Sequence, residues 1–150
     1  WLAGAANVGV TTYNDGIVFQ TLGSGTTLTT VPTDGSVVKI VDTTVTLPAG
    51  WGSADVFFRG YINHRVTAAT TTIRRFNVGV RLNGTVIDSQ DFSVAPVAEN
   101  TYTPPVSLST KSGALTTSRL VSLESRLFST DKTLCSVSSW ALEAILVRRT

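Results

Sequence analysis

The pair Asn83-Gly84 is the feature that most constrains how this chain can fold. Two runs of β-prone residues flank it directly, Arg74 to Leu82 before the pair and Thr85 to Val94 after it. Asn and Gly tolerate the positive φ values that both central residues of a type I′ turn require, and the twist of that turn matches a right-handed strand pair. The sequence therefore predicts a tight antiparallel hairpin at mid-chain, and with it an antiparallel β protein.

Further short β-prone runs lie on both sides of this hairpin. The chain is rich in Thr, Ser and Val and contains no Met, a composition that favours strands. Turn residues separate the runs at Asn14-Asp15-Gly16, Gly23-Ser24-Gly25, Thr33-Asp34-Gly35, Pro48-Ala49-Gly50, Pro104-Pro105, Lys111-Ser112-Gly113 and Ser129 to Lys132. The expected strands are Val8 to Tyr13, Ile17 to Thr21, Val37 to Leu47, Ala54 to Val66, Thr72 to Leu82, Thr85 to Val94, Thr101 to Ser109, Arg119 to Ser129 and Trp140 to Arg149.

This regular spacing predicts an all-β fold in which two antiparallel sheets pack as a sandwich or barrel. The 150 residues contain no linker and no internal repeat, so we expect a single β-sandwich domain over 1–150 with one core. Because the chain opens on Trp1 without a Met, we expect it to be the C-terminal part of a longer chain.

The central hairpin predicts one irregularity. Its second strand does not continue the apolar face of the first, because a two-residue loop sets Asp91 opposite Phe76 while Phe92 falls on the other parity. We therefore expect a β-bulge between Ser89 and Asp91 that returns Phe92 to the core.

The last run, Trp140 to Arg149, is apolar on both faces and is interrupted only by Glu143. One face of a strand in an antiparallel sandwich normally meets solvent, so a strand apolar on both sides needs a second covering layer. Another subunit is one candidate for that layer, and a loop of the same chain is the other. If a subunit covers the strand, we expect it to contact Trp140, Leu142 and Leu146.

The run Ala54 to Val66 has a similar pattern. Its second face mixes aromatic residues with arginine, a combination enriched in interface hot spots and also able to stack on sugar rings. These residues predict a subunit contact or a ligand face, although amphipathic side chains covering a solvated strand would have the same pattern. The residues concerned are Phe57, Arg59 and Tyr61.

No set of residues marks a catalytic centre. His64 is the only histidine and shares the apolar parity of its strand with Ile62, so we expect a core or interface residue. The chain has no Gly-x-Ser-x-Gly motif, and one histidine with one cysteine, Cys135, leaves most of a zinc shell unfilled. The aspartates do not form a calcium-loop series either. We therefore expect no catalytic residue, no metal, no cofactor and no enzymatic activity.

Charge and hydropathy exclude two further classes of partner. The net charge is only +2, and the only adjacent basic pairs are Arg74-Arg75 and Arg148-Arg149, too few for a nucleic-acid surface. No apolar run reaches the ~18 residues needed to cross a bilayer. We therefore expect neither nucleic-acid binding nor membrane insertion. A single cysteine also precludes an intramolecular disulfide.

The short strands, the Leu82-Asn83-Gly84-Thr85-Val86-Ile87 hairpin and the hydrophobic final strand together resemble a jelly roll. In particular, the chain resembles the trimeric jelly-roll heads, similar in design to tumour necrosis factor and C1q domains, of bacteriophage fibres and receptor-binding proteins. The resemblance implies a homotrimer with its terminal strand near the threefold axis. It also implies a virion or extracellular location, and ligands such as host surface saccharides bound near subunit boundaries or apical loops.

Two other roles stay open at this point. A capsid head-fibre or decoration protein would use the same trimer to attach to a virion shell protein, with no host ligand. A monomeric carbohydrate-binding module would be a β-sandwich with an aromatic platform. Loop aromatics distinguish these roles, because an exposed indole stacks on pyranose rings whereas a buried one closes the sandwich end. The candidate ligand contacts are Trp51, Tyr13 and Tyr102.

Overall fold

The mid-chain hairpin is present as predicted in a computed structural model of the chain. Asn83 has φ 48° and Gly84 has φ 83°, so both central residues adopt the positive φ of a type I′ turn. The backbone N–H of Asn83 donates a hydrogen bond to the carbonyl of Leu120, at 2.7 Å. The turn is therefore fastened to the strand beside the hairpin as well as closing the hairpin itself.

The structure describes residues 9–13, 16–26, 29–31, 36–66, 74–94, 101–102, 106–128 and 135–150. These residues form strands and connecting turns and contain no helix. The strands are β1 (Gly9–Tyr13), β2 (Ile17–Gly25), β3 (Thr29–Val31), β4 (Val38–Val45), β5 (Ala54–Val66), β6 (Arg74–Leu82), β7 (Thr85–Val94), β8 (Thr101–Tyr102), β9 (Val106–Leu115), β10 (Arg119–Phe128) and β11 (Cys135–Arg148).

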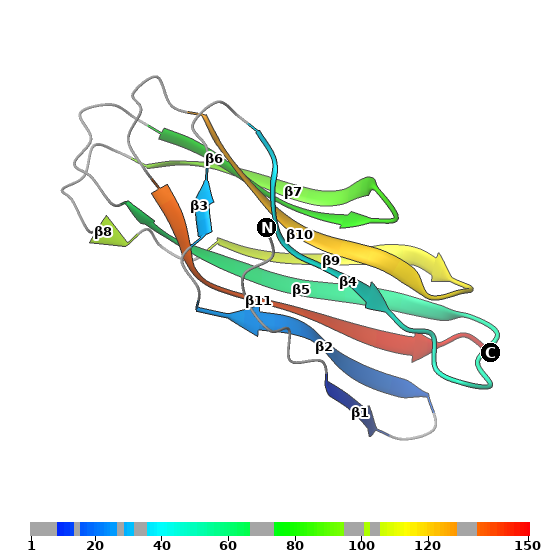
Figure 1. The fold of residues 1–150 in the computed structure, drawn as a ribbon. Coiled ribbons are helices and arrows are strands. Elements are labelled where there is room, and N and C mark those ends of the chain that lie inside the picture. Colours follow the sequence, from blue (N-terminus) through cyan, green and yellow to red (C-terminus); the bar gives the residue numbers. More distant parts are fainter. Residues whose placement is uncertain are drawn as a thin grey trace.

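Two antiparallel sheets pack face to face as a jelly-roll-like sandwich, which confirms the predicted fold class. The larger, seven-stranded sheet runs β1-β2-β11-β5-β8, with β3 also paired to β11 and β9 also paired to β5. The smaller, four-stranded sheet runs β4-β10-β6-β7. In Figure 1, β11 (red) lies between β2 (blue) and β5 in one layer, and β10 (orange) lies in the other layer.

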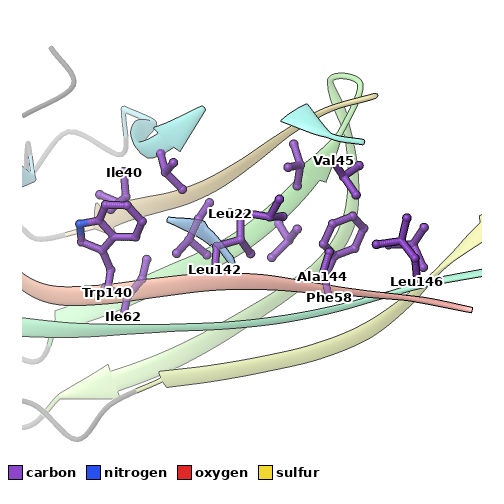
Figure 2. Close-up of a cluster of buried hydrophobic side chains, with 14 of the residues drawn as sticks. Leu22, Ile40, Val45, Phe58, Ile62, Trp140, Leu142, Ala144 and Leu146 are labelled. Carbon is purple, nitrogen blue, oxygen red and sulfur yellow. The ribbon is translucent and has the colours of Figure 1, made fainter. Parts of the chain in front are cut away.

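One parity of β11 forms the centre of the core. Trp140, Leu142, Ala144 and Leu146 project to the same side of the strand, toward residues such as Ile40 and Val45 that come from the other sheet (Figure 2). Three of these four β11 residues are fully buried and Trp140 is 3% exposed. The larger buried side chains around them are Leu22, Phe58, Ile62, Val78, Val80, Val121 and Leu123.

This packing corrects the expected role of three residues. Trp140, Leu142 and Leu146 are core residues of a single chain, because the smaller sheet already covers the face on which they lie. A side chain that its own chain buries completely has no surface left for a second subunit. Only the opposite parity of β11, which includes Ile145 and Val147, remains partly exposed.

The predicted bulge exists, but it lies nearer the turn than expected. The register of β6 and β7 pairs Arg81 with Val86 and Val80 with Asp88, so Ile87 is the extra residue. Phe92 is thereby set opposite Phe76, as the bulge was expected to achieve. Ile87 packs against the core, so the extra residue of the bulge adds an apolar contact. A bulge at Ser89 or Asp91, as expected from the sequence, would have put a polar residue there.

Two expected turns are strand instead. Gly23 to Gly25 continue β2 and pair with β11, where a Cβ on Gly25 would come within 2.8 Å of the Trp140 indole nitrogen. The glycine is therefore needed for close packing against the indole. Lys111 to Gly113 likewise lie inside β9, beside a register irregularity with β5. The run expected over 101–109 contains β8 and the first part of β9, with 103–105 outside the described residues, and β3 was not predicted.

A buried and an exposed leucine predict different costs of truncation. Leu142→Ala removes a fully buried side chain and should lower the free energy of unfolding by about 2–5 kcal/mol, as cavity-creating core changes do. Leu120→Ala, at a leucine of β10 that is 56% exposed, is the matched control and should cost less than half as much. Urea denaturation of the two variants measures both values. Equal losses would contradict the assignment of the core face.

Candidate functional site

An apolar stripe runs across the outer face of the larger sheet. Large apolar side chains are exposed there at Phe19 (41%), Tyr61 (38%), Ile17 and Phe57. Together with two partly buried residues of β11, Ile17, Phe19 and Phe57 form a patch on this face. We define the apolar stripe as Ile17, Phe19, Phe57, Ile145 and Val147; the exposed Tyr61 lies on the same face of β5 but beyond Arg59.

Strand register makes this stripe continuous. Ile145 at the centre pairs with Phe19 of β2 on one side and with Phe57 of β5 on the other. Val147 similarly pairs with Ile17. Directly opposite residues on one face of a sheet have Cβ atoms about 4.5–5.5 Å apart, so these side chains are contiguous. A contiguous exposed apolar patch of this kind is typical of an interaction surface.

Charges of both signs border the apolar stripe. Arg59 and Glu143 are exposed cross-strand partners, so Glu143 lies on the solvent face of β11. The Lys111 Nζ lies 5.4 Å from the centre of the Phe57 ring, within the range of a cation–π contact. Asp55 accepts a 2.8 Å hydrogen bond from Arg149 Nε and lies 3.3 Å from Lys111 Nζ.

These neighbours affect the titration of Asp55. The hydrogen bond from Arg149, and then the hydrogen bond from Lys111, lower the pKa of the Asp55 carboxyl below its usual value. The carboxylate therefore stays charged at neutral pH, and the border of the apolar stripe keeps both signs of charge.

The outer face of the smaller sheet is polar and has two hollows. The first, here called the polar hollow, has a volume of about 280 Å³ and is lined by Asn77, Gly79, Arg81, Val86, Ser89, Asp91, Glu124 and Arg126. A second hollow of about 520 Å³ lies toward β4 and the hairpin turn and is lined by Val37, Lys39, Asp42, Arg81, Asn83, Gly84, Leu120, Ser122 and Glu124. Arg81 and Glu124 line both hollows.

The shared pair Arg81–Glu124 is an ion pair with little exposure. Arg81 Nε donates a 2.6 Å hydrogen bond to Glu124 Oε2, and the two side chains are 26% and 7% exposed. Ser122 Oγ donates to the other carboxylate oxygen at 3.2 Å, and Arg81 Nη1 donates to the Gly84 carbonyl at 2.9 Å. Burying a carboxylate is costly unless such bonds compensate it, so this pair is held in one geometry.

His64 is a core residue, as its parity predicts. It is fully buried, and its Nε2 shares a 2.8 Å hydrogen bond with Oγ of Ser125, which is also fully buried on β10. The bond joins the two sheets through the interior. Burial lowers the pKa of His64 to about 4, because desolvation disfavours the charged imidazolium. This histidine and serine are thus enclosed, with no surface of either exposed to a substrate.

The structure brings together only some of the residues predicted from sequence. Phe57, Arg59 and Tyr61 lie at successive outward positions of β5 and are exposed, as their shared parity predicts. Trp51 follows the predicted turn, in which its N–H donates to the Pro48 carbonyl, and its indole packs partly against the core. It therefore helps to close the sandwich end. The side chains of Tyr13 and Tyr102, and of Cys135, lie outside the described residues.

Sequence reasoning missed the polar hollow. Its parity in β10 puts Glu124 on the outer face of the sheet, where a charged residue is normally exposed, but Glu124 is only 5% exposed and is bonded to Arg81. One signal was available, since Gly79 interrupts the strand between Val78 and Val80 without any turn residue beside it.

The described residues contain no group of three or more His, Cys, Asp or Glu side chains arranged to hold a metal ion. They also include no helix with the length and apolar character to span a bilayer.

Comparison with known proteins gives similarity of fold alone. No protein-family model matches the chain, and no curated protein matches it in sequence. Among solved structures, it resembles a chain of the T13 viral particle of infectious bursal disease virus, with a TM-score of 0.54 and 12% identity over 89% of this chain and 32% of the viral chain. This chain thus spans about a third of the length of that capsid chain.

Weaker similarities have TM-scores below 0.5. The structure of the infectious bursal disease virus Gx strain matches at 0.47 with 10% identity, over 88% of this chain and 32% of that one. The C-terminal domain of EclA, described as a sugar-binding protein, matches at 0.44 with 17% identity, over 79% of this chain and 78% of that domain. At these scores and identities no role transfers to this chain.

The buried histidine predicts how stability depends on pH. His64 titrates with a pKa near 6.5 when unfolded and about 4 when folded, so the unfolded chain binds the proton first as pH falls. Stability from this residue is therefore complete above pH 6.5 and is lost toward pH 4, by roughly 3 kcal/mol at 1.36 kcal/mol per pKa unit. Urea denaturation across this range measures the slope.

His64→Gln is the control variant, because an amide can keep a hydrogen bond to Ser125 without titrating. Its stability should vary much less between pH 6.5 and 4 than that of the unsubstituted protein. The same slope in both proteins would show that other groups cause the pH dependence.

Proposed function

We propose that this chain is a non-enzymatic structural and adhesion domain of a virion, which assembles as a homotrimer through the apolar stripe. The observation that carries the proposal is the contiguous apolar surface on the outer face of the larger sheet. Phe19, Ile145 and Phe57 meet there in register, and the two phenylalanines are 41% and 36% exposed. Burial of such a surface between copies would contribute about 25 cal/mol per Å² of apolar area.

The chemistry around the stripe favours another copy of this chain as the occupant. Phe57, Tyr61 and Arg59 are of the residue types enriched at the centres of protein interfaces. Arg59 and Glu143 lie beside each other at the border, so each copy would offer both a cation and an anion to its neighbour. The resemblance to trimeric jelly-roll heads supplies the expected number of subunits, and the similarity to a viral capsid chain is consistent with a virion setting.

Adhesion is the second part of the proposal. A domain of this kind would bind a saccharide on the host surface, whereas a capsid head-fibre or decoration protein would assemble in the same way and bind a virion shell protein instead. The polar face of the smaller sheet, with its two hollows, favours the adhesion role over the decoration role. A monomeric carbohydrate-binding module would share that face but leave the apolar stripe exposed.

The assembly surface can be tested by charge substitution. The unsubstituted protein should have three times the 15.9 kDa mass of one chain by light scattering after size exclusion at low micromolar concentration. Phe19→Glu combined with Phe57→Glu should give a folded monomer, because carboxylates would be buried at the interface without partners. Circular dichroism verifies that the variant keeps its β structure.

Leu120→Glu is the matched control for this experiment. Leu120 is 56% exposed on the outer face of the smaller sheet, so the same change there should leave the mass at that of the trimer. A monomeric unsubstituted protein would refute the proposed assembly and bring forward the carbohydrate-module role. A double variant that remains trimeric would exclude the apolar stripe as the contact surface.

A further inference from the structure

Gly79 opens the polar hollow, although nothing in the fold requires a glycine there. Its φ is not positive, and a Cβ built on it would meet only ordinary contacts, 3.5 Å from the Asp88 carbonyl and 3.7 Å from the Ser89 Cβ. By contrast, a Cβ on Gly25 would clash with Trp140. Glycine in a strand interior weakens the strand and often marks a close approach of a ligand or another chain.

The position of Gly79 makes the missing side chain significant. It lies on the outer face between Glu124 of β10 and Ser89 of β7, its partners in register. The next rows of the same face hold Arg81 beside Ser122, and Asn77 beside Arg126. Polar side chains therefore surround Gly79, whose backbone is buried and forms part of the lining of the polar hollow.

Bulges in both edge strands shape the same region. In β4 the register shifts opposite Leu123 and Glu124, so that Ile40 is the extra residue. In β7 the extra residue is Ile87, opposite Val80 and Arg81. Both register shifts fall between the row of paired residues that contains Arg81 and the row that contains Gly79. Bulges are common beside functional sites, where they redirect side chains. Because of these bulges, Lys39 and Asp42 of β4 both face outward, and so do Val86 and Ser89 of β7.

The central ion pair is preorganised for hydrogen bonding to a ligand. The two bonds of Arg81, to Glu124 and to the Gly84 carbonyl, occupy two of the five N–H donors of its guanidinium. The Glu124 carboxylate likewise has more acceptor sites than its bonds from Arg81 and Ser122 use. A fixed donor beside a fixed acceptor suits adjacent hydroxyl groups, each of which can accept from one and donate to the other.

The charges that line the hollows favour a neutral ligand. The polar hollow has two cations, Arg81 and Arg126, and two anions, Asp91 and Glu124. The second hollow also has two of each, since Lys39 and Asp42 join the shared pair and bond to each other at 2.8 Å. With no net charge to attract an ion, the available chemistry is a dense set of donors and acceptors beside the exposed apolar surfaces of Val86 and Leu120.

We propose that the outer face of the smaller sheet binds a neutral saccharide chain, with one sugar unit over Gly79 in the polar hollow and the next across Arg81–Glu124 in the second hollow. Arg81 and Glu124 line both hollows, so this hydrogen-bonding pair would lie at the junction between two neighbouring sugar units. The site rests on the adhesion part of the proposed function, and it lies on a sheet face, whereas the ligand contacts expected from the sequence lie in loops.

The test is a titration of isotope-labelled protein with neutral sugars, followed in two-dimensional amide spectra. The probes are glucose, galactose, mannose, N-acetylglucosamine, maltotriose and cellotriose, with galacturonic acid as the acidic comparison. At least one neutral probe should shift the amides of Gly79, Arg81 and Glu124 while leaving Gly60 and Ala141 of the larger sheet unchanged. A trisaccharide of the same sugar should bind more tightly than the single unit.

Gly79→Val is the decisive variant, because it fills the hollow with a residue that favours strands and so should not unfold the protein. It should abolish the localised shifts while keeping or raising the thermal midpoint. Gly113→Val is the matched control, since a Cβ at Gly113 of β9 meets nothing within 4 Å, and it should bind as before. Arg81→Lys, which keeps the charge but loses the planar fork, should weaken binding about tenfold.

Several results would overturn the proposed saccharide site. Absence of localised shifts with every neutral probe, shifts confined to the turn around Trp51, or shifts that persist in Gly79→Val would each overturn the site. Binding of galacturonic acid alone would overturn the assignment of a neutral ligand. Light scattering on the same samples separates this inference from the assembly proposal, because a monomer that binds sugar refutes only the trimer, and a trimer that binds none refutes the adhesion site.

Discussion

Burial of one face of β11 is the interaction on which the rest of the structure depends. The strand pairs with β5 along most of its length and with β2 over Trp140 to Val147, so it supplies the hydrogen bonds at the centre of the larger sheet. Its inward residues, with Leu142 fully buried among them, pack against the smaller sheet and hold the two layers together. Because successive side chains alternate, this burial also determines which residues face outward, and the apolar stripe follows from it.

Local sequence signals predicted the parts of the fold that depend on local chemistry. The Asn83-Gly84 turn and the bounds of β5 and β7 were correct because turn geometry and β-prone runs are properties of neighbouring residues. The errors arose where distant residues decide. Gly25 looks like a loop glycine until Trp140 is placed against it, and Leu142 looks available to a subunit until the smaller sheet covers it. The same limit applies to Glu124, whose shielding depends on Arg81 from another strand.

The two outer faces of the sandwich differ in the residues that strand register brings together on them. On the larger sheet, in-register pairing puts Ile145 between Phe19 and Phe57, so apolar groups accumulate. On the smaller sheet, bulges at Ile40 and Ile87 turn those isoleucines toward the core and leave polar neighbours outside. An extra apolar residue in each edge strand thus improves the interior packing and at the same time makes the exterior polar. Bulges of this kind also make edge strands less able to pair with other chains.

The back-to-back arrangement of the two sheets has a consequence for avidity. An assembly that buries the outer face of the larger sheet would leave the face around Gly79 turned to solvent in every copy. Several identical weak sites carried on one rigid particle act at a high effective concentration toward a surface that repeats its ligand, and overall binding can then exceed that of one site by about 10²–10⁴. Shallow hollows of about 280 and 520 Å³ would then be sufficient for firm but reversible attachment.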